Sequence, residues 1–279
     1  MTNPAQIKES VLKDLHSNRL QLPTLPEVAL HIRDALQDEN VEVGKIAKVV
    51  TTDPAICTKL LQVVNSPLYR SNRPVDNIKT AITRLGYVQV KNLVCSLAMK
   101  QMYQSTNKTA NMLLHECWDH SARVAAIASV MANGLKGLSK DQAILAGLVH
   151  DIGKLPLIVH AEQIPGLIED SAAMRLLFEA LHTDVGTHVL TDWNFPQELV
   201  DVAKHHENFS HQSPANVSYA DVITVANLFA YYGVEHTLAE SDWPQVGAFS
   251  RLGISPDGTF IENEENLVAI AEVEKILKN

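Results

Sequence analysis

The sequence predicts an all-α protein. Apolar residues recur at spacings of three and four along almost the whole chain, which is the period of a helix with one buried face. Alternating runs of β-branched residues, the pattern of a half-buried strand, are scarce. Start and stop signals also separate the apolar segments, so we expect many helices joined by turns.

The composition is that of an acidic globular protein. The chain has 279 residues, 46% hydrophobic and 20% charged, enough for one large domain or two lobes. Its net charge is −9 without a cluster of Lys and Arg, which argues against nucleic acid as a partner. There is no signal-peptide pattern, no apolar run of membrane-spanning length, and no metal-site spacing among the three cysteines. We therefore expect a cytoplasmic protein of bacterial type without a membrane partner.

The polar stretch 104–108 is the best candidate boundary between two helical lobes. No internal repeat and no low-complexity tract divides the chain further. The expected segments are an N-terminal helix (1–18), an N-terminal lobe (19–107), a histidine-bearing lobe (108–233) and a C-terminal extension of unknown purpose (234–279).

Capping signals define the helices of the N-terminal lobe. Asp53-Pro54 predicts an N-cap followed by proline at the first helical position, and the stretch 65–67 ends this helix. Leu85-Gly86 predicts a helix end closed by glycine, and an apolar helix follows from 88 to about 102. Asn65 either caps its helix or forms a hydrogen bond across the lobes, and the sequence leaves both open.

Helices also account for the rest of the chain. Ser139 predicts an N-cap, Gly153 a tight turn, and Pro196 the opening of a helix. Residues 234–262 are rich in Pro, Gly, Ser and Asp and predict an irregular connection. The expected helices lie near 109–134, 140–149, 172–181, 183–193, 197–207, 214–233 and 263–278.

Acidic and imidazole side chains recur in the second lobe at spacings typical of a metal site on helices. Imidazole and carboxylate together are the ligands that divalent metals and phosphoryl-transfer centres require. The candidates are Glu116, His120, His150, Asp151, His182, His205 and His206.

Glu116 and His120 are four residues apart, so both project from one face of a helix. A surface Glu–His pair is the preferred reading for Glu116 alone. His120 is the better candidate, because small and apolar residues follow it and place it near a buried face.

The doublet His150-Asp151 ends an apolar helix. A buried carboxylate is costly unless a metal or an ion pair compensates it, and Lys154 is close enough in sequence to form that pair. In a working phosphoesterase the same lysine would neutralise a phosphate oxygen.

His205 and His206 are adjacent, so on a helix they diverge by roughly 100°. Both can serve one site only if it lies between their faces or holds more than one metal. For either residue alone, a surface histidine at a helix end is the alternative. His115, His160, His188 and His211 have no partner at a useful spacing, and we assign them structural or surface roles.

Taken in order, these residues resemble the metal-binding series of HD-type phosphohydrolases. More specifically, the span from about Leu22 to Gly233 resembles the HDOD domain, a signalling relative of that superfamily. The supporting motifs are Leu22-Pro23-Thr24-Leu25-Pro26, Thr52-Asp53-Pro54, Val64-Asn65-Ser66-Pro67, Ala81-Ile82-Thr83-Arg84-Leu85-Gly86, Trp118-Asp119-His120-Ser121, His150-Asp151-Ile152-Gly153-Lys154, His182 with Gly186, Trp193-Asn194-Phe195-Pro196, His205-His206-Glu207 and Ala226-Asn227-Leu228.

Two departures bear on activity. Where catalytic HD proteins carry a last aspartate ligand, the matching position here is Asn227, which offers a carbonyl oxygen but no charge. Asp221 lies about 240° away around a helix and is a poor substitute. The Gly-Tyr-Pro signature of related cyclic-di-GMP phosphodiesterases is missing after the histidine pair, so the sequence does not support that activity.

The resemblance implies an HD-superfamily-like helical bundle with an additional N-terminal helical lobe, used in bacterial signal transduction. Our first hypothesis is a non-catalytic regulatory module with a protein partner or a small signalling ligand, which retains a divalent metal. The second is a metal-dependent phosphohydrolase of phosphomonoesters or nucleotide phosphodiesters. In it, Asp151 bridges two ions if two are bound, Lys154 stabilises the phosphoryl oxygens, and a metal-bound hydroxide attacks phosphorus. Iron, manganese or nickel suits the ligands, as one or two ions.

Overall fold

The computed structural model describes residues 9, 11–14, 20–36, 38, 41–66, 69, 74–211 and 217–278. The helix predicted in 1–18, Pro67 and the start of the helix predicted in 214–233 fall largely or wholly outside these residues. Within them the fold is all-α, without a strand, as predicted. The helices are α2 (Glu27–Ala35), α3 (Val43–Thr51), α4 (Pro54–Val64), α5 (Ile78–Leu85), α6 (Tyr87–Met99), η2 (Lys100–Met102), α7 (Lys108–Ala132), α8 (Lys140–Val149), α9 (Lys154–Glu162), α10 (Ser171–Asp192), α11 (Gln197–His205), α12 (Tyr219–Ala230), η3 (Trp243–Gln245), α13 (Gly247–Leu252), α14 (Thr259–Glu262) and α15 (Glu264–Lys278).

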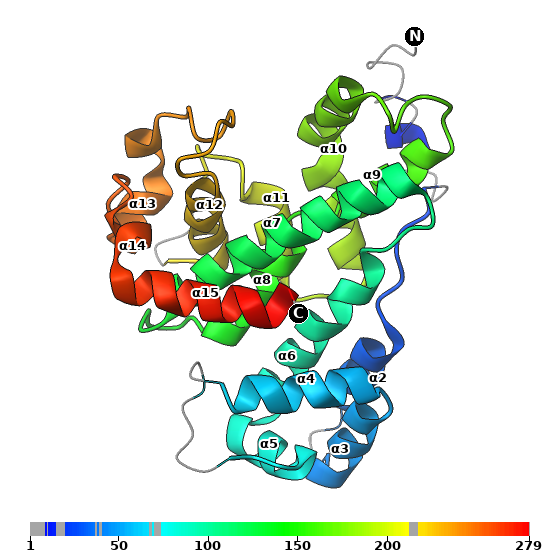
Figure 1. Cartoon of the computed structure of the whole chain (residues 1–279), viewed down its shortest axis with the longest axis vertical. Helices are drawn as coiled ribbons and strands as arrows, with labels where there is room; N and C mark the ends of the chain where they lie inside the picture. The colour runs from blue at the N-terminus through cyan, green and yellow to red at the C-terminus, as the bar shows by residue number, and fades with distance from the viewer. Residues whose placement is uncertain are drawn as a thin grey trace.

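The helices form two groups that meet through α6 and α8. Helices α2 to α6 pack on one another and occupy the lower part of Figure 1, while α7 to α15 fill the upper part. Buried apolar residues run through both groups as one continuous core. Helix α6 is buried along most of its length, because it contacts α2, α4 and α5 on one side and α8 on the other.

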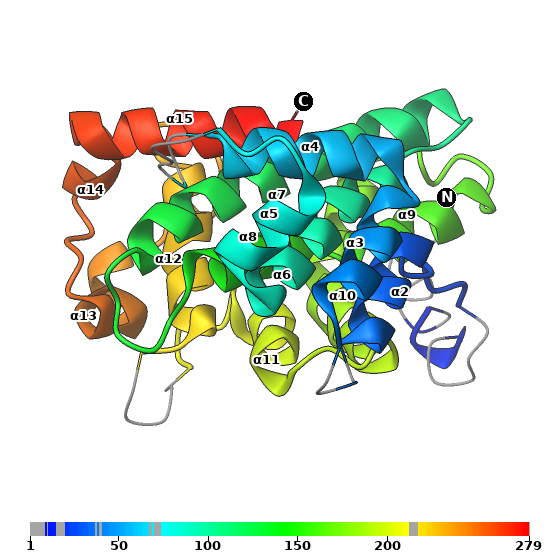
Figure 2. The same ribbon diagram turned by 90° about the horizontal axis from the view of Figure 1, so that it is seen from below.

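The long helix α7 is the centre of the second group. Helices α8, α12 and α15 all pack against it. Figure 2 shows α15 along the top edge of the molecule. Gly147 of α8 allows a very close approach, because a Cβ there would lie 2.4 Å from the Cα of Ala125. A glycine therefore sets the distance between the two helices that carry the first predicted site residues.

The predicted caps form. The Asp53 carboxylate accepts hydrogen bonds from the backbone N–H groups of Ala55 and Ile56, with Pro54 at the first helical position. Ser139 caps α8 in the same way. Gly86 has a φ of +84°, which ends α5 and starts α6 within one residue.

Asn65 caps α4 and ties a neighbouring segment to it. Its side-chain amide donates to the carbonyls of Leu61 and Val75, and its Oδ1 accepts from the Val75 N–H. Of the two readings left open for Asn65, the structure therefore supports capping, and these hydrogen bonds do not cross between the lobes.

Three predicted elements differ in the structure. The two helices expected near 172–181 and 183–193 are one helix, α10, because the chain stays helical through His182 and also through Gly186, and α10 contains no proline. The connection 234–262 contains the short helices η3, α13 and α14, and its aromatic side chains pack on Phe229. Gly153 has an ordinary φ of −67°, so tight turn geometry is not why a glycine stands there.

The stretch 140–162 is long and apolar enough to cross a membrane by length and composition. In the structure it comprises α8, a turn at 150–153 and α9, and 83% of its most apolar window is buried in the fold. Its hydrophobicity is therefore accounted for by the core.

Candidate metal centre

Side chains from four helices lie around one buried carboxylate, that of Asp151. His120 comes from the middle of α7, and His150 and Asp151 from the end of α8 and the turn after it. His182 lies halfway along α10, and His206 is the C-cap of α11. The contacts among α7, α8, α9, α10 and α11 bring these distant residues together.

Gly153 sets the approach of the Asp151 turn to α10. A Cβ on Gly153 would lie 2.0 Å from the carbonyl oxygen of His182 and 2.5 Å from the backbone nitrogen of Gly186. Only glycine permits this approach. The glycine of the His-Asp-Ile-Gly-Lys motif therefore places Asp151 beside His182.

The two oxygens of Asp151 face two different histidine pairs. Oδ2 lies 3.8 Å from Nε2 of His120 and 3.4 Å from Nε2 of His150. Oδ1 lies 3.5 Å from the Nε2 atoms of both His182 and His206. Both groups of three have their ligand atoms within 4.8 Å of one another, so either group could hold an ion, and Asp151 could bridge two.

Backbone carbonyls fix the orientation of three imidazoles. The Nδ1 atoms of His150, His182 and His206 contact the carbonyl oxygens of Gly147 (2.7 Å), Phe178 (2.6 Å) and Val202 (3.2 Å). A carbonyl only accepts, so Nδ1 carries the proton in each case and Nε2 presents its lone pair to the cluster. Partners of this kind hold histidines in the orientation that metal binding needs.

The Nε2 atoms of His182 and His206 are 3.2 Å apart. In neutral imidazoles of this tautomer they are two lone pairs facing each other, which is unfavourable unless a cation lies between them. Two metal–nitrogen bonds of about 2.1 Å at an angle of roughly 100° give this separation. In addition, Nε2 of His150 and Oδ1 of Asp151 are buried without a hydrogen-bond partner among the described residues. The residues present therefore fit a divalent metal.

Lys154 compensates the buried carboxylate. It is the first residue of α9, and its ammonium contacts Oδ2 of Asp151. Burial raises the pKa of Asp151, but Lys154 and His150 outweigh it and hold the pKa well below its usual range. Burial likewise lowers the pKa of Lys154, and Asp151 outweighs it, so the pKa of Lys154 is raised. Asp151 is therefore ionised and Lys154 charged.

The structure does not bring Glu116 or His205 into the cluster, which corrects the expectation for these two residues. Glu116 is exposed, one turn before His120 on α7. His205 points away from His206, as adjacent residues on a helix do, and its ring stacks on that of His211 at 4.0 Å. His211, assigned no partner from the sequence, is therefore the partner of His205.

The sequence profile of the HDOD domain matches residues 22–209, which is more than half of the chain. The chain belongs to the HDOD family. The matched span includes every member of the cluster.

Solved structures share this fold. A Shewanella amazonensis SB2B protein named as a candidate metal-dependent phosphohydrolase is 29% identical, covers 99% of this chain and 100% of its own, and superposes with a TM-score of 0.87. An HDOD domain protein of unknown function from Geobacter sulfurreducens is 20% identical, and the match covers 98% of each chain with a TM-score of 0.68. A candidate signal transduction protein from Marinobacter aquaeolei VT8 is 20% identical, covers 100% of this chain and 67% of its own, and gives 0.63. The last two show the fold alone.

An uncharacterised protein of Treponema pallidum (strain Nichols) is 25% identical over 221 residues. The match covers 74% of this HDOD chain but only 42% of the Treponema protein. The chain therefore spans less than half the length of that relative.

Asn227, the family position discussed above, is buried on α12 next to His120. Burial and His150 hold the pKa of His120 well below its usual value. Nε2 of His120 and Oδ1 of Asn227 are both buried without a hydrogen-bond partner among the described residues. Asp221 is occupied elsewhere, because Arg251 donates two hydrogen bonds to its Oδ1 and Ser218 contacts its Oδ2. The HDOD chain thus has an amide, without a spare aspartate, on the His120 side.

Glu207 is a site residue for which sequence reasoning assigned no role. Its carboxylate oxygens lie 3.6 Å from Nε2 of His182 and 4.0 Å from Nε2 of His206. Its position directly after His206 in the motif is the one signal that could have pointed to it.

Proposed function

We propose that this HDOD protein is a regulatory module that holds one divalent metal and does not hydrolyse phosphoesters. The main support for a bound metal is that the Nε2 atoms of His182 and His206 face each other, 3.2 Å apart. Oδ1 of Asp151 and the carboxylate of Glu207 complete a set of two imidazoles and two carboxylates around the same space. Such a mixed set suits iron, manganese or nickel.

The His182 side is favoured over the His120 side by charge. Oδ1 of Asp151 is free to bind, whereas Oδ2 is already in contact with Lys154. On the His120 side, Asn227 supplies an amide where a second carboxylate would be needed to balance an ion. One ion per chain follows from this asymmetry.

Burial of the ligands and the ion pair of Lys154 both oppose turnover. A catalytic metal site keeps an open position for water or substrate, but the Asp151 carboxylate is only 3% exposed and the rings of His150, His182 and His206 at most 2%. The ammonium of Lys154 is held by Asp151, so it is not free to neutralise a phosphate. The metal would then act as a structural or sensing element in a cytoplasmic signalling protein.

A second candidate function is metal-dependent phosphohydrolysis. It is favoured by the Shewanella relative of 29% identity, which is named for that activity. A bound metal would polarise a phosphoryl oxygen and activate a water molecule. Asp151 would help to hold that metal, and Lys154 would turn from Asp151 to stabilise the phosphoryl oxygens.

Anaerobic purification followed by elemental analysis and a hydrolysis screen separates the two candidates. We expect one iron, manganese or nickel per chain and no hydrolysis of bis(p-nitrophenyl) phosphate, nucleotide monophosphates or cyclic dinucleotides. Turnover by the metal-loaded protein that disappears in His150→Ala would overturn the regulatory proposal. Protein without stoichiometric metal would overturn the metal site in both proposals.

A further inference from the structure

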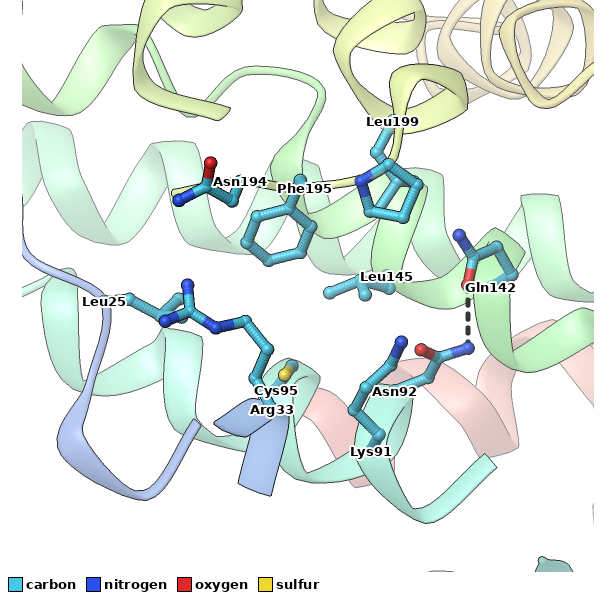
Figure 3. A pocket seen from close by; sticks show the side chains of 11 residues that line it. Leu25, Arg33, Lys91, Asn92, Cys95, Gln142, Leu145, Asn194, Phe195 and Leu199 are labelled. Atoms are coloured by element: carbon cyan, nitrogen blue, oxygen red, sulfur yellow. Dashed lines mark hydrogen bonds between the residues drawn. The ribbon is translucent and has the colours of Figure 1, made fainter. Parts of the chain in front are cut away.

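A cavity of about 120 Å³ lies between the two groups of helices, away from the metal centre. Helices α2 and α6 supply one wall, and α8, α11 and the loop after α10 supply the other (Figure 3). Its apolar lining comes from leucine, phenylalanine, proline and cysteine side chains. The polar lining residues are Arg33, Lys91, Asn92, Gln142 and Asn194.

Asn92 leaves a buried polar atom facing this cavity. The residue is only 1% exposed, and its side-chain nitrogen donates to Oε1 of Gln142 at 2.8 Å. Its Oδ1 is buried and has no hydrogen-bond partner within the described part of the chain. Figure 3 shows this oxygen turned from α6 toward the hollow. A buried acceptor without a donor is destabilising, so a donor that enters the cavity would satisfy it.

The cavity is positively charged. None of the residues that line it, all of them described, carries a carboxylate. Lys91 has no ion-pair partner in the described part of the chain, and Figure 3 shows its ammonium directed toward the hollow beside Asn92. Arg33 is held in place by Asp34 and by a 2.9 Å hydrogen bond to the carbonyl of Trp193. Arg33 is therefore already paired, and the lining offers the Lys91 ammonium beside Asn92 as the cation for a ligand.

The surroundings hold this cavity rigidly. Nε1 of Trp193 donates to the carbonyl of Pro23 at 2.9 Å, which links the two sides of the cavity together with the Arg33–Trp193 and Asn92–Gln142 hydrogen bonds. Asn194 has a φ of +53°, a conformation that asparagine tolerates, and it turns the chain so that Phe195 closes the cavity. The space is therefore built by long-range contacts and is not a gap in a flexible surface.

We propose that this cavity binds a small carboxylate that carries a hydroxyl or amino group beside the acid and a short branched apolar body. The acid pairs with Lys91, the adjacent donor satisfies Oδ1 of Asn92, and the apolar body packs against Leu145, Leu199 and Phe195. A cavity of about 150 Å³ holds one benzene molecule, so the ligand is of roughly that size. The site contacts both groups of helices and does not depend on the metal centre.

The test is isothermal titration of the metal-free full chain, dialysed free of chelator, with 2-hydroxy-3-methylbutanoate. We expect saturable binding with a Kd of about 1 mM or lower. The neutral amide of this acid, which lacks the charge, and 3-methylbutanoate, which lacks the hydroxyl, should both bind more weakly.

Two variants assign the binding to this cavity. Lys91→Met should weaken the hydroxy acid about tenfold or more, because it removes a charged hydrogen bond, whereas Lys136→Met, at an exposed lysine, should not change it. Asn92→Leu should abolish the preference for the hydroxy acid over 3-methylbutanoate. Adding Mn²⁺ should leave the affinity unchanged.

Three outcomes would overturn the proposal. They are the absence of saturable binding, equal affinity in Lys91→Met and Lys136→Met, and binding that requires added Mn²⁺. The last would place the carboxylate on the metal centre. Because the titration uses metal-free protein, failure of the proposed metal site would not affect its result.

Discussion

Gly153 and His182 are in backbone contact across two helices. The space where a side chain on Gly153 would begin is filled by the carbonyl of His182, 2.0 Å from the position of a Cβ. This contact fixes the turn that carries Asp151 against α10, so the geometry of the cluster depends on a residue that offers no ligand atom.

Gly153→Ala should therefore lower the free energy of unfolding by about 1–3 kcal/mol or more, as overpacking of a core does, and should weaken metal binding. Urea unfolding measures the first effect and titration with Mn²⁺ the second. Gly44→Ala is the matched control, because a Cβ there meets nothing within 4 Å. The helix propensity of alanine should leave that variant unchanged or more stable by up to about 1 kcal/mol. Equal stability of the two variants would contradict this account.

Lys154→Met removes the cation that compensates Asp151. In metal-free protein we expect a loss of about 3–5 kcal/mol of stability, the usual cost of leaving one partner of a buried ion pair alone. Added Mn²⁺ should restore much of this loss, because a metal can replace the lysine as the counter-charge. Lys204→Met, at an exposed lysine on α11, is the control. Thermal denaturation with and without Mn²⁺ gives the result, and a variant as stable as the wild type would argue against the ion pair.

The metal-free protein should lose stability as the pH falls below about 6.5. Burial is the main cause that lowers the pKa values of His120 and His182 in the folded state. Below pH 6.5 the unfolded chain therefore binds more protons than the folded chain, and stability decreases by about 1.4 kcal/mol per pH unit for each such histidine. Chemical unfolding between pH 7.5 and 5 measures this slope, and His120→Gln should reduce it. A flat profile would show that these imidazoles titrate normally.

Asn227→Asp tests the proposal that each chain holds one ion and not two. The His120–His150 pair lacks a free carboxylate oxygen, since Oδ2 of Asp151 contacts Lys154. An aspartate next to His120 would supply one, so the stoichiometry of Mn²⁺ should rise from one toward two per chain. Asn227→Leu should stay at one. If the Asp variant also binds a single ion with unchanged affinity, Asn227 does not face a second site.

Local sequence signals predicted much of this fold. The caps at Asp53 and Ser139 and the glycine at 86 form as expected, because each depends on residues within one helical turn. The expected break in α10 at 182 was wrong, because the polar residues there continue the helix and no strong breaker is present. The short helices after Ala230 were missed, because turn residues interrupt the helical spacing of their apolar residues. Aromatic packing on Phe229, which the sequence does not reveal, holds them in place.

The candidate site could be predicted only in part. The structure gathers His120, His150, Asp151, His182 and His206, but their binding of a metal stays a prediction. Glu116 and His205 have side chains that bind metals, but neither joins the cluster. Glu116 is exposed, and His205 projects from another face of its helix than His206 does. The role of Gly153 and the cavity beside Asn92 arise from contacts between segments far apart in the sequence, which spacing alone does not reveal.

The adjacent histidines offer the most direct test of the metal centre. His206 faces Asp151 and His182 within the cluster, whereas His205 stacks on His211 outside it. Metal content by elemental analysis should therefore fall from about one ion per chain to near zero in His206→Ala and stay at the wild-type level in His205→Ala, with both proteins folded by circular dichroism. Equal metal content in the two variants would contradict the proposal that His182, His206 and Asp151 hold the ion.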